Sequence, residues 1–185
     1  MSTNRIQLGQ GFSLLLGGVR SGKSDLAVEL GKAFDGEVVF VATAEALDDE
    51  MAERITRHKT DRPDDWELIE APLLDAGTIA SVTPDALLII DCITLLATNL
   101  MMADKTNKQI EDHVSILTHA LVSRTAPTIV ISNEVGLGVH PETELGRRFR
   151  GVLGRANKRL GSRAETALFV SAGRAIPLQQ LEIGW

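Results

Sequence analysis

Eight consecutive residues carry the strongest chemical signal in this sequence. The segment GGVRSGKS at residues 17–24 matches the pattern G-x-x-x-x-G-K-[ST], with an apolar stretch before it and an amphipathic one after it. Glycines let the backbone curl so that its N–H groups point at phosphate oxygens, and a following helix adds positive potential. Lys23 is expected to reach the outer phosphates and Ser24 to hold Mg²⁺. The predicted phosphate-binding residues are Gly17, Gly18, Val19, Arg20, Ser21, Gly22, Lys23 and Ser24.

A carboxylate follows the apolar stretch ALLII, residues 86–90. At the end of a buried strand beside a phosphate loop, such a group binds Mg²⁺ or accepts a proton from a substrate hydroxyl. We therefore predict that Asp91 is catalytic and forms a metal site with Ser24, although a simple turn role stays open. Asn133 and Glu134 follow the next apolar stretch and are further candidates, since ligands bind at the carboxyl ends of parallel strands. For Glu134, a plain loop carboxylate fits equally well.

One histidine lies in a strongly cationic segment, RITRHKTDRP at residues 54–63. On the residues alone, the simplest interpretation of His58 is a partner of the helix dipole at a helix end. The alternative is nucleophilic catalysis, because a neutral imidazole is nucleophilic and largely deprotonated near neutral pH. Met51, Ile55 and His58 share one face of the expected helix, which directs the imidazole inward. The residues by themselves leave both interpretations open.

Short apolar stretches and amphipathic stretches alternate along the chain. Strands are expected at residues 12–17, 37–43, 66–72, 86–91, 127–132, 166–173 and 174–178. Helices are expected at residues 24–34, 47–59 and 142–160, and around the apolar positions Ile110, Val114, Leu117 and Leu121. We expect Leu145 on the apolar face of its helix, and His113 and His119 in solvent. This order favours an α/β fold of the P-loop NTPase, RecA-like kind, with a mostly parallel central sheet flanked by helices. The strand with Pro177 is expected at an antiparallel C-terminal edge.

Composition narrows the class of protein. The 185 residues fit one domain, 1–185, with residues 1–11 as a candidate flexible segment. The net charge of −6 disfavours a nucleic-acid partner. A single cysteine, Cys92, excludes an internal disulfide and fits the cytoplasm, and we interpret it as a small buried residue. We expect no membrane insertion and no secretion signal, because the apolar runs are short.

Four segments together resemble a known enzyme family. They are GGVRSGKS, VATAEALDDEMAERITRHKTDRP, LIIDCITLLATNL and SNEVGLGVHPETELGRRFRGVLGRANKRL. In this order they look like the bifunctional adenosylcobinamide kinase / adenosylcobinamide-phosphate guanylyltransferase family of cobalamin biosynthesis. The resemblance extends from about residue 12 to about residue 178. The phosphate loop alone is generic, whereas its combination with the histidine segment and NEVGLG is much more specific.

The resemblance implies two reactions and a role for His58. Adenosylcobinamide is phosphorylated by ATP or GTP, and its phosphate then receives GMP that GTP has first placed on a histidine, here His58. The family also implies a homotrimer. It implies nucleotide contacts at Thr43, Ala44, Glu45, Lys59, Thr60, Asp61, Arg62 and Glu70. Glu70 is suited to accept from guanine N–H groups, although an exposed strand-end acid is its alternative. The sequence leaves the corrinoid pocket and the role of His140 undetermined.

Two alternatives differ from this interpretation. A single-function P-loop kinase of a small alcohol would need only the phosphate loop and Asp91, with His58 structural. An ATPase or GTPase module that moves a macromolecule would share the phosphate loop, since that loop serves kinases, switches and motors alike. The acidic net charge argues against the second alternative.

Overall fold

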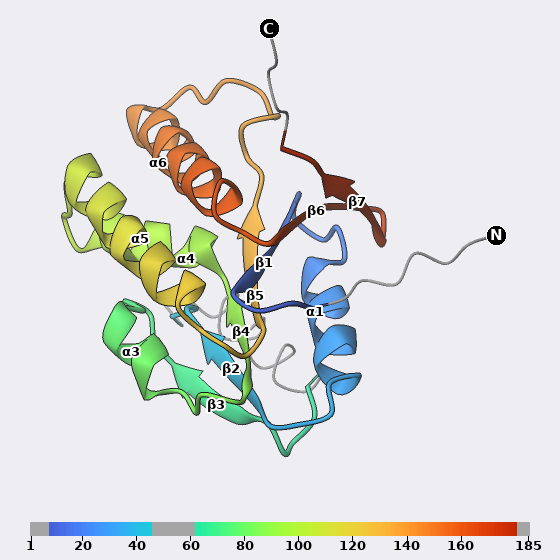
Figure 1. Cartoon of the computed structure of the whole chain (residues 1–185). Coiled ribbons are helices and arrows are strands. Elements are labelled where there is room, and N and C mark those ends of the chain that lie inside the picture. Colours follow the sequence, from blue (N-terminus) through green and yellow to red (C-terminus); the bar gives the residue numbers. More distant parts are fainter. Residues whose placement is uncertain (1–7, 46–61, 181–185) are drawn as a thin grey trace, which may run out of the picture.

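A computed structural model of the chain describes residues 8–45 and 62–180. Its centre is one seven-stranded sheet with the order β3-β2-β4-β5-β1-β6-β7 (Figure 1). The strands are β1 Phe12–Gly17, β2 Val38–Ala42, β3 Glu67–Glu70, β4 Leu87–Asp91, β5 Thr128–Asn133, β6 Thr166–Ser171 and β7 Arg174–Leu178. All seven coincide with strands expected from the sequence, with ends shifted by a few residues.

The strands run parallel except at one edge. Each neighbouring pair from β3 to β6 is parallel, and only β7 pairs antiparallel, with β6. This arrangement confirms the predicted parallel sheet with an antiparallel C-terminal edge. It also brings the carboxyl ends of six strands to the same edge of the sheet, which is where ligands bind in such folds.

Helices cover both faces of the sheet. They are α1 Lys23–Lys32, α3 Ala76–Ser81, α4 Ile93–Met102, α5 Asn107–Val122 and α6 Glu144–Gly161. Figure 1 shows α1 on one face, while α3, α4, α5 and α6 lie on the other. Alternate strand residues follow this division: Leu14 and Leu16 join the core under α4–α6, whereas Leu15 joins the core under α1. The strands are therefore apolar on both faces, as expected for a covered parallel sheet.

Three sequence expectations need correction. We expected one helix between β4 and β5, but the structure has two, because α4 is apolar around most of its surface and shows no clear polar face. Leu145 is exposed at the start of α6, although it continues the apolar spacing of that helix. His113 is half-buried with its Nε2 2.7 Å from the carbonyl oxygen of Leu74, whereas we expected it in solvent. The helix expected at residues 47–59 lies outside the described residues.

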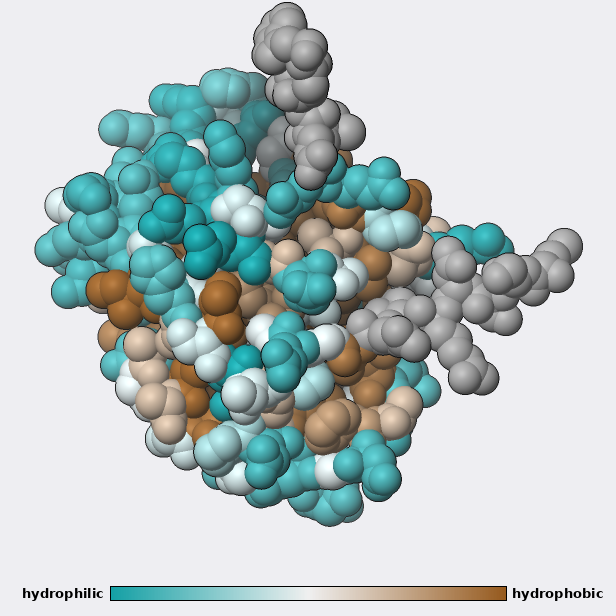
Figure 2. Space-filling model, viewed as in Figure 1, coloured by the Kyte–Doolittle hydropathy of each residue, from teal (hydrophilic) through white to brown (hydrophobic). Residues whose placement is uncertain are grey.

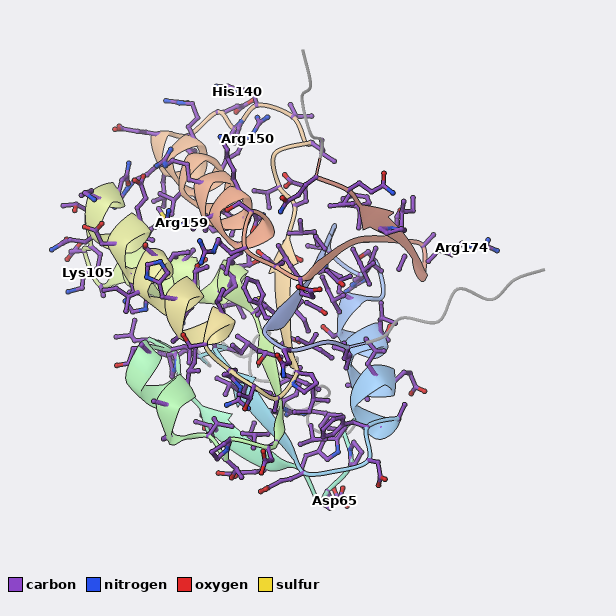
Figure 3. All side chains as sticks on the ribbon, viewed as in Figure 1. Asp65, Lys105, His140, Arg150, Arg159 and Arg174 are labelled. Atoms are coloured by element: carbon purple, nitrogen blue, oxygen red, sulfur yellow. The ribbon has the colours of Figure 1, made fainter. Side chains whose placement is uncertain are left out.

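The basic helix α6 is attached to α5 by its arginines. Arg155 pairs with Glu111 at 2.6 Å, Arg148 donates to the Asn107 side chain at 2.8 Å, and Arg159 donates to the Ser115 hydroxyl. Figure 3 shows Arg159 between the two helices, and Figure 2 shows that the surface over them is mostly hydrophilic. A groove of about 290 Å³ lies between α5 and α6. Because these side chains bond to each other across it, the groove is a feature of helix packing.

Candidate nucleotide site

Two glycines shape the phosphate loop through backbone conformations that side chains rarely adopt. Gly17 has φ 154° and Gly22 has φ 98°, both in a region that disfavours side chains. A Cβ on Gly17 would lie 2.1 Å from the carbonyl oxygen of Val170 in the neighbouring strand. Gly22 is also the N-cap of α1, so that the helix begins at Lys23 with its N-terminus at the loop. The predicted strand–loop–helix arrangement of residues 17–24 is therefore present.

Lys23 is folded back over this loop. Its side chain is buried, and Nζ donates to the carbonyl oxygens of Gly17 at 3.0 Å and Gly18 at 2.6 Å. The same ammonium lies 3.4 Å from the Ser21 hydroxyl. An ammonium held by the loop's own carbonyl groups is positioned to meet phosphate oxygens that enter the loop.

Ser24 and Asp91 meet although they are far apart in the sequence. The Ser24 hydroxyl donates to Asp91 Oδ2 at 2.9 Å, which joins the first turn of α1 to the end of β4. Both side chains are half-buried. A hydroxyl and a carboxylate are the oxygen ligands that Mg²⁺ uses in phosphate-loop sites. Within the described residues, no cluster of three His, Cys, Asp or Glu side chains could hold a metal ion. This pair fits an ion that takes its other ligands from water and phosphates.

Neighbouring strands support the loop from both sides. The Glu134 N–H donates to the carbonyl oxygen of Gly17 at 3.0 Å, beyond the end of β5. The Gly173 N–H, in the turn between β6 and β7, donates to the carbonyl oxygen of Ser21 at 2.9 Å. We call residues 17–24 with Asp91 the phosphate half of the site. Its backbone is thus fixed by segments on either side of β1.

A second group of predicted site residues lies at the ends of β2 and β3. We call residues 43–45 with Glu70 the β2–β3 half. Glu70 is paired in register with Ala42, which in turn is paired with Asp91, so one row of residues crosses from this half to the phosphate half. Glu45 and Glu70 are exposed and Ala44 is half-buried. The structure therefore brings both predicted halves to the same edge of the sheet.

Thr43 has a different position from its neighbours in this half. Its side chain is fully buried, accepts from the Cys92 N–H at 2.8 Å and donates to the Cys92 carbonyl oxygen at 2.7 Å. The Thr43 hydroxyl therefore fixes the chain that follows Asp91. Because this hydroxyl is already bonded, a nucleotide could contact Thr43 only through its backbone. The role of Thr43 as a contact residue stays a prediction.

Arg62 lies on the α1 face of the sheet, against Phe40 of β2. Its guanidinium stacks over the Phe40 ring, 4.1 Å from the ring centroid, in a cation–π contact. The remaining predicted residues of this segment, His58, Lys59, Thr60 and Asp61, lie outside the described residues. The nucleophile assignment therefore remains a hypothesis from the sequence.

The candidate residues at the end of β5 and in the loop after it have different surroundings. The backbone of Asn133 is bonded on both sides: its N–H donates to the Thr94 hydroxyl at 2.8 Å, and its carbonyl accepts from Asn157 at 3.0 Å. The Glu134 carboxylate accepts from the Gly136 N–H, which is the plain loop role that we left open. His140 is exposed on the loop above Arg150, as Figure 3 shows.

Cys92 is chemically inert at this edge. Burial, together with the negative charge of Asp91, raises the pKa of the Cys92 thiol to about 12. The group is therefore a neutral thiol near neutral pH, since nucleophilic cysteines need a lowered pKa. Its interpretation as a small buried residue is confirmed.

Sequence reasoning missed three polar side chains that hold this edge together: Thr94, Asn99 and Asn157. All three are buried. They stand among apolar residues in α4 and at the buried face of α6, where a polar residue needs a hydrogen-bond partner. An asparagine within the apolar run ITLLATNLMM was the signal that would have revealed Asn99.

The sheet order, the phosphate loop and the Ser24–Asp91 pair define a P-loop NTPase with a RecA-like fold. Solved structures agree. An ATPase of a type III secretion system in pathogenic bacteria superposes with a TM-score of 0.57 at 12% identity, covering 87% of this chain and 51% of that one. The RadB recombinase superposes with a TM-score of 0.51 at 19% identity, covering 88% of this chain and 74% of that one. At such identities the likeness shows the fold alone.

Sequence comparison gives the family. A model of the family described as "Cobinamide kinase / cobinamide phosphate guanyltransferase" matches residues 13–178, and the chain belongs to this family. It is 37% identical to the "Bifunctional adenosylcobalamin biosynthesis protein CobU" of Salmonella typhimurium, over 90% of this chain and 98% of that protein. It is 38% identical to the corresponding CobP protein of Pseudomonas aeruginosa, over 90% and 96%. The resemblance inferred from the four segments is thus confirmed, and with it a bifunctional kinase and guanylyltransferase class.

Proposed function

We propose that this chain phosphorylates adenosylcobinamide at its aminopropanol hydroxyl and then transfers GMP from GTP to that phosphate through His58. The product is adenosylcobinamide-GDP, an intermediate in assembly of the nucleotide loop of cobalamin. The observation that carries the proposal is the joining of Lys23, Ser24 and Asp91 at one sheet edge, in a chain that belongs to the two-activity family.

The phosphate half supports the phosphoryl transfer. Lys23 lies where it can neutralise charge on the outer phosphates of ATP or GTP, and the loop N–H groups and the start of α1 add to this. Ser24 and Asp91 are the residues that would hold Mg²⁺, which when bound neutralises charge on the triphosphate. Asp91 is also suited to accept the proton of the attacking hydroxyl, because its carboxylate lies at the ligand edge.

The guanylyl transfer needs a nucleophile and a leaving group. An imidazole nitrogen of His58 attacks the α-phosphorus of GTP, a nitrogen–phosphorus bond forms, and the bond to pyrophosphate breaks. A phosphate oxygen of adenosylcobinamide phosphate then attacks the same phosphorus, and the bond to His58 breaks. We propose that Thr43 to Glu45, Lys59 to Arg62 and Glu70 contact the guanine nucleotide, with Glu70 accepting from guanine N–H groups.

Assembly and location are part of the same proposal. The family relationship leads us to propose a homotrimer in the cytoplasm that is not inserted in a membrane and has no nucleic-acid partner. Within the described part of the chain, every helix is too short or too polar to cross a bilayer.

The test uses GTP labelled at the α-phosphate. We expect the wild-type protein to gain one acid-labile guanylyl group on residues 54–62, seen by intact mass and peptide mapping. His58→Ala should lose the label completely yet still phosphorylate adenosylcobinamide. His119→Ala is the matched control, because His119 is an exposed histidine on α5. Absence of label on the wild type would favour a single-function kinase. Equal loss of both reactions in a folded His58 variant would contradict the separate roles.

A further inference from the structure

One buried amide connects the two strands of the β2–β3 half. Asn99 in α4 is only 7% exposed. Its Nδ2 donates to the carbonyl oxygen of Thr43 at 2.8 Å and to that of Pro72 at 2.9 Å. Both N–H groups of a single amide are thus used on two chain segments that are distant in the sequence.

The two acceptors lie just beyond the strand ends. Thr43 follows β2 and comes two residues before Glu45, while Pro72 follows β3 and comes two residues after Glu70. The last ladder bond between the segments runs from the Ala71 N–H to the carbonyl oxygen of Ala42 at 2.9 Å. Asn99 therefore extends the connection past the point where the sheet stops. The side chain of Asn99 thus links the segment that carries Glu45 to the segment that follows Glu70.

We infer that Asn99 is a positioning residue for guanine recognition, because its amide fixes the spacing of the segments that present Glu45 and Glu70. The inference rests on the proposed function, since that function puts Glu45 in contact with the guanine nucleotide and Glu70 at the guanine N–H groups. Asn99 touches no substrate itself. Its effect is on the carboxylates, which must be held in the plane of the guanine edge to accept from N1–H and the 2-amino group.

A second asparagine provides a matched comparison. Asn157 in α6 is 6% exposed, and its Nδ2 donates to the carbonyl oxygen of Asn133 at 3.0 Å. Its Oδ1 accepts from the Ser132 hydroxyl at 2.6 Å. These partners belong to β5, whose end is paired in register with Gly17. Asn157 thus supports the phosphate half in the way that Asn99 supports the β2–β3 half. The two residues share type and burial and differ in the half that they hold.

The experiment compares GTP with inosine triphosphate, which lacks the 2-amino group. Dissociation constants of the two Mg²⁺–nucleotide complexes are measured by calorimetry for the wild type, Asn99→Ala and Asn157→Ala. We expect the wild type to prefer GTP, and Asn99→Ala to lower that preference by about three- to tenfold, the effect of losing a hydrogen bond. Asn157→Ala should weaken the binding of both nucleotides by the same factor, so the preference of this variant for GTP stays at the wild-type value.

Several results would overturn the inference. An unchanged GTP preference in Asn99→Ala would do so, and so would an equal loss of preference in Asn157→Ala. If Asn99→Ala does not fold, Asn99→Ser retains one donor, and we expect an intermediate loss of preference; a wild-type value there overturns the inference. A wild type without any GTP preference overturns it together with the guanine contacts at Glu45 and Glu70. Acid-labile label on His58 in that case would still uphold the proposed guanylyl transfer.

Discussion

The two halves of the site are built in different ways. The phosphate half consists of one continuous segment and one distant carboxylate, and its main polar contacts involve the segment's own backbone, as in Lys23 bonding to Gly17 and Gly18. The β2–β3 half consists of separate segments that are held by buried side chains, Thr43 and Asn99. The phosphate half is thus held mainly through backbone groups, including those of Glu134 and Gly173, whereas the β2–β3 half depends on the buried side chain of Asn99 behind it. Substitutions in the phosphate half should therefore affect every nucleotide alike, whereas substitutions in or behind the β2–β3 half should affect the preference for GTP.

The largest effect is expected from removing the ammonium of the phosphate half. Lys23→Ala should lower the kinase turnover number by about 10²–10³-fold, because a preorganised charge on the transferring phosphate is lost. Guanylylation should also weaken. Turnover is measured with adenosylcobinamide and ATP. Lys32→Ala is the control, since Lys32 forms an exposed pair with Glu29 at 3.1 Å on the same helix. Near-normal turnover in Lys23→Ala would remove the phosphate half from the kinase reaction.

The Ser24–Asp91 pair gives the next largest effect. Asp91→Asn should raise the Mg²⁺ concentration for half-maximal kinase rate by about ten- to hundredfold, because a neutral amide holds the ion more weakly. Initial rates are measured over a Mg²⁺ titration. Asp25→Asn, an exposed acid in the first turn of α1, should keep the wild-type titration. If Asp91→Asn gave the wild-type midpoint with only a lower rate, Asp91 would act as a proton acceptor and not at the ion.

A smaller effect distinguishes the β2–β3 half. Glu70→Gln should weaken GTP binding by about tenfold, since a hydrogen bond to a charged acceptor is replaced by a neutral one. Binding is measured by calorimetry for GTP and ATP in parallel. Glu67→Gln, at the other end of β3, is the exposed control. If ATP binding were weakened by the same factor, Glu70 would affect the whole site and would not recognise guanine.

The smallest effect on the site is expected from a residue just outside the β2–β3 half, the N-cap of α3. Asp75 caps α3 by accepting from the Thr78 N–H at 2.8 Å, and this bond lowers the pKa of its carboxyl below the usual 3.8. Asp75→Ala should cost about 1 kcal/mol of unfolding free energy and leave the GTP preference intact. Because the folded pKa is lowered, the carboxylate's stabilisation is present above the unfolded value and is lost as pH falls through the folded one.

The cap prediction is checked by denaturant unfolding between pH 2.5 and 7. Asp75→Asn keeps the cap without the titrating charge, so its stability should lack this acid-dependent part while staying close to the wild type at pH 7. A loss of GTP preference in Asp75→Ala would extend the β2–β3 half to α3.

Local patterns predicted the strand–loop–helix arrangement of residues 17–24 and the place of Asp91 at a strand end, because a loop motif and an apolar strand are both readable within a few residues. All seven strands and the β7 edge followed from apolar stretches and Pro177 in the same way. The sequence did not separate α4 from α5, because a helix that is buried on most sides has no polar face to mark its turns. Nor did it reveal Asn99, whose partners lie 56 and 27 residues away. Such contacts exist only after the sheet has formed.

The bond from Gly173 to Ser21 has a consequence for synthesis on the ribosome. Residues 17–24 emerge early, yet they are completed by the β6–β7 turn and by β6, which pairs with β1. A nascent chain that ends before residue 166 thus carries the whole glycine-rich motif without the partners that hold its outer turn. Nucleotide capture should therefore begin only when translation has passed the β6–β7 hairpin, and shorter nascent chains should not bind triphosphate.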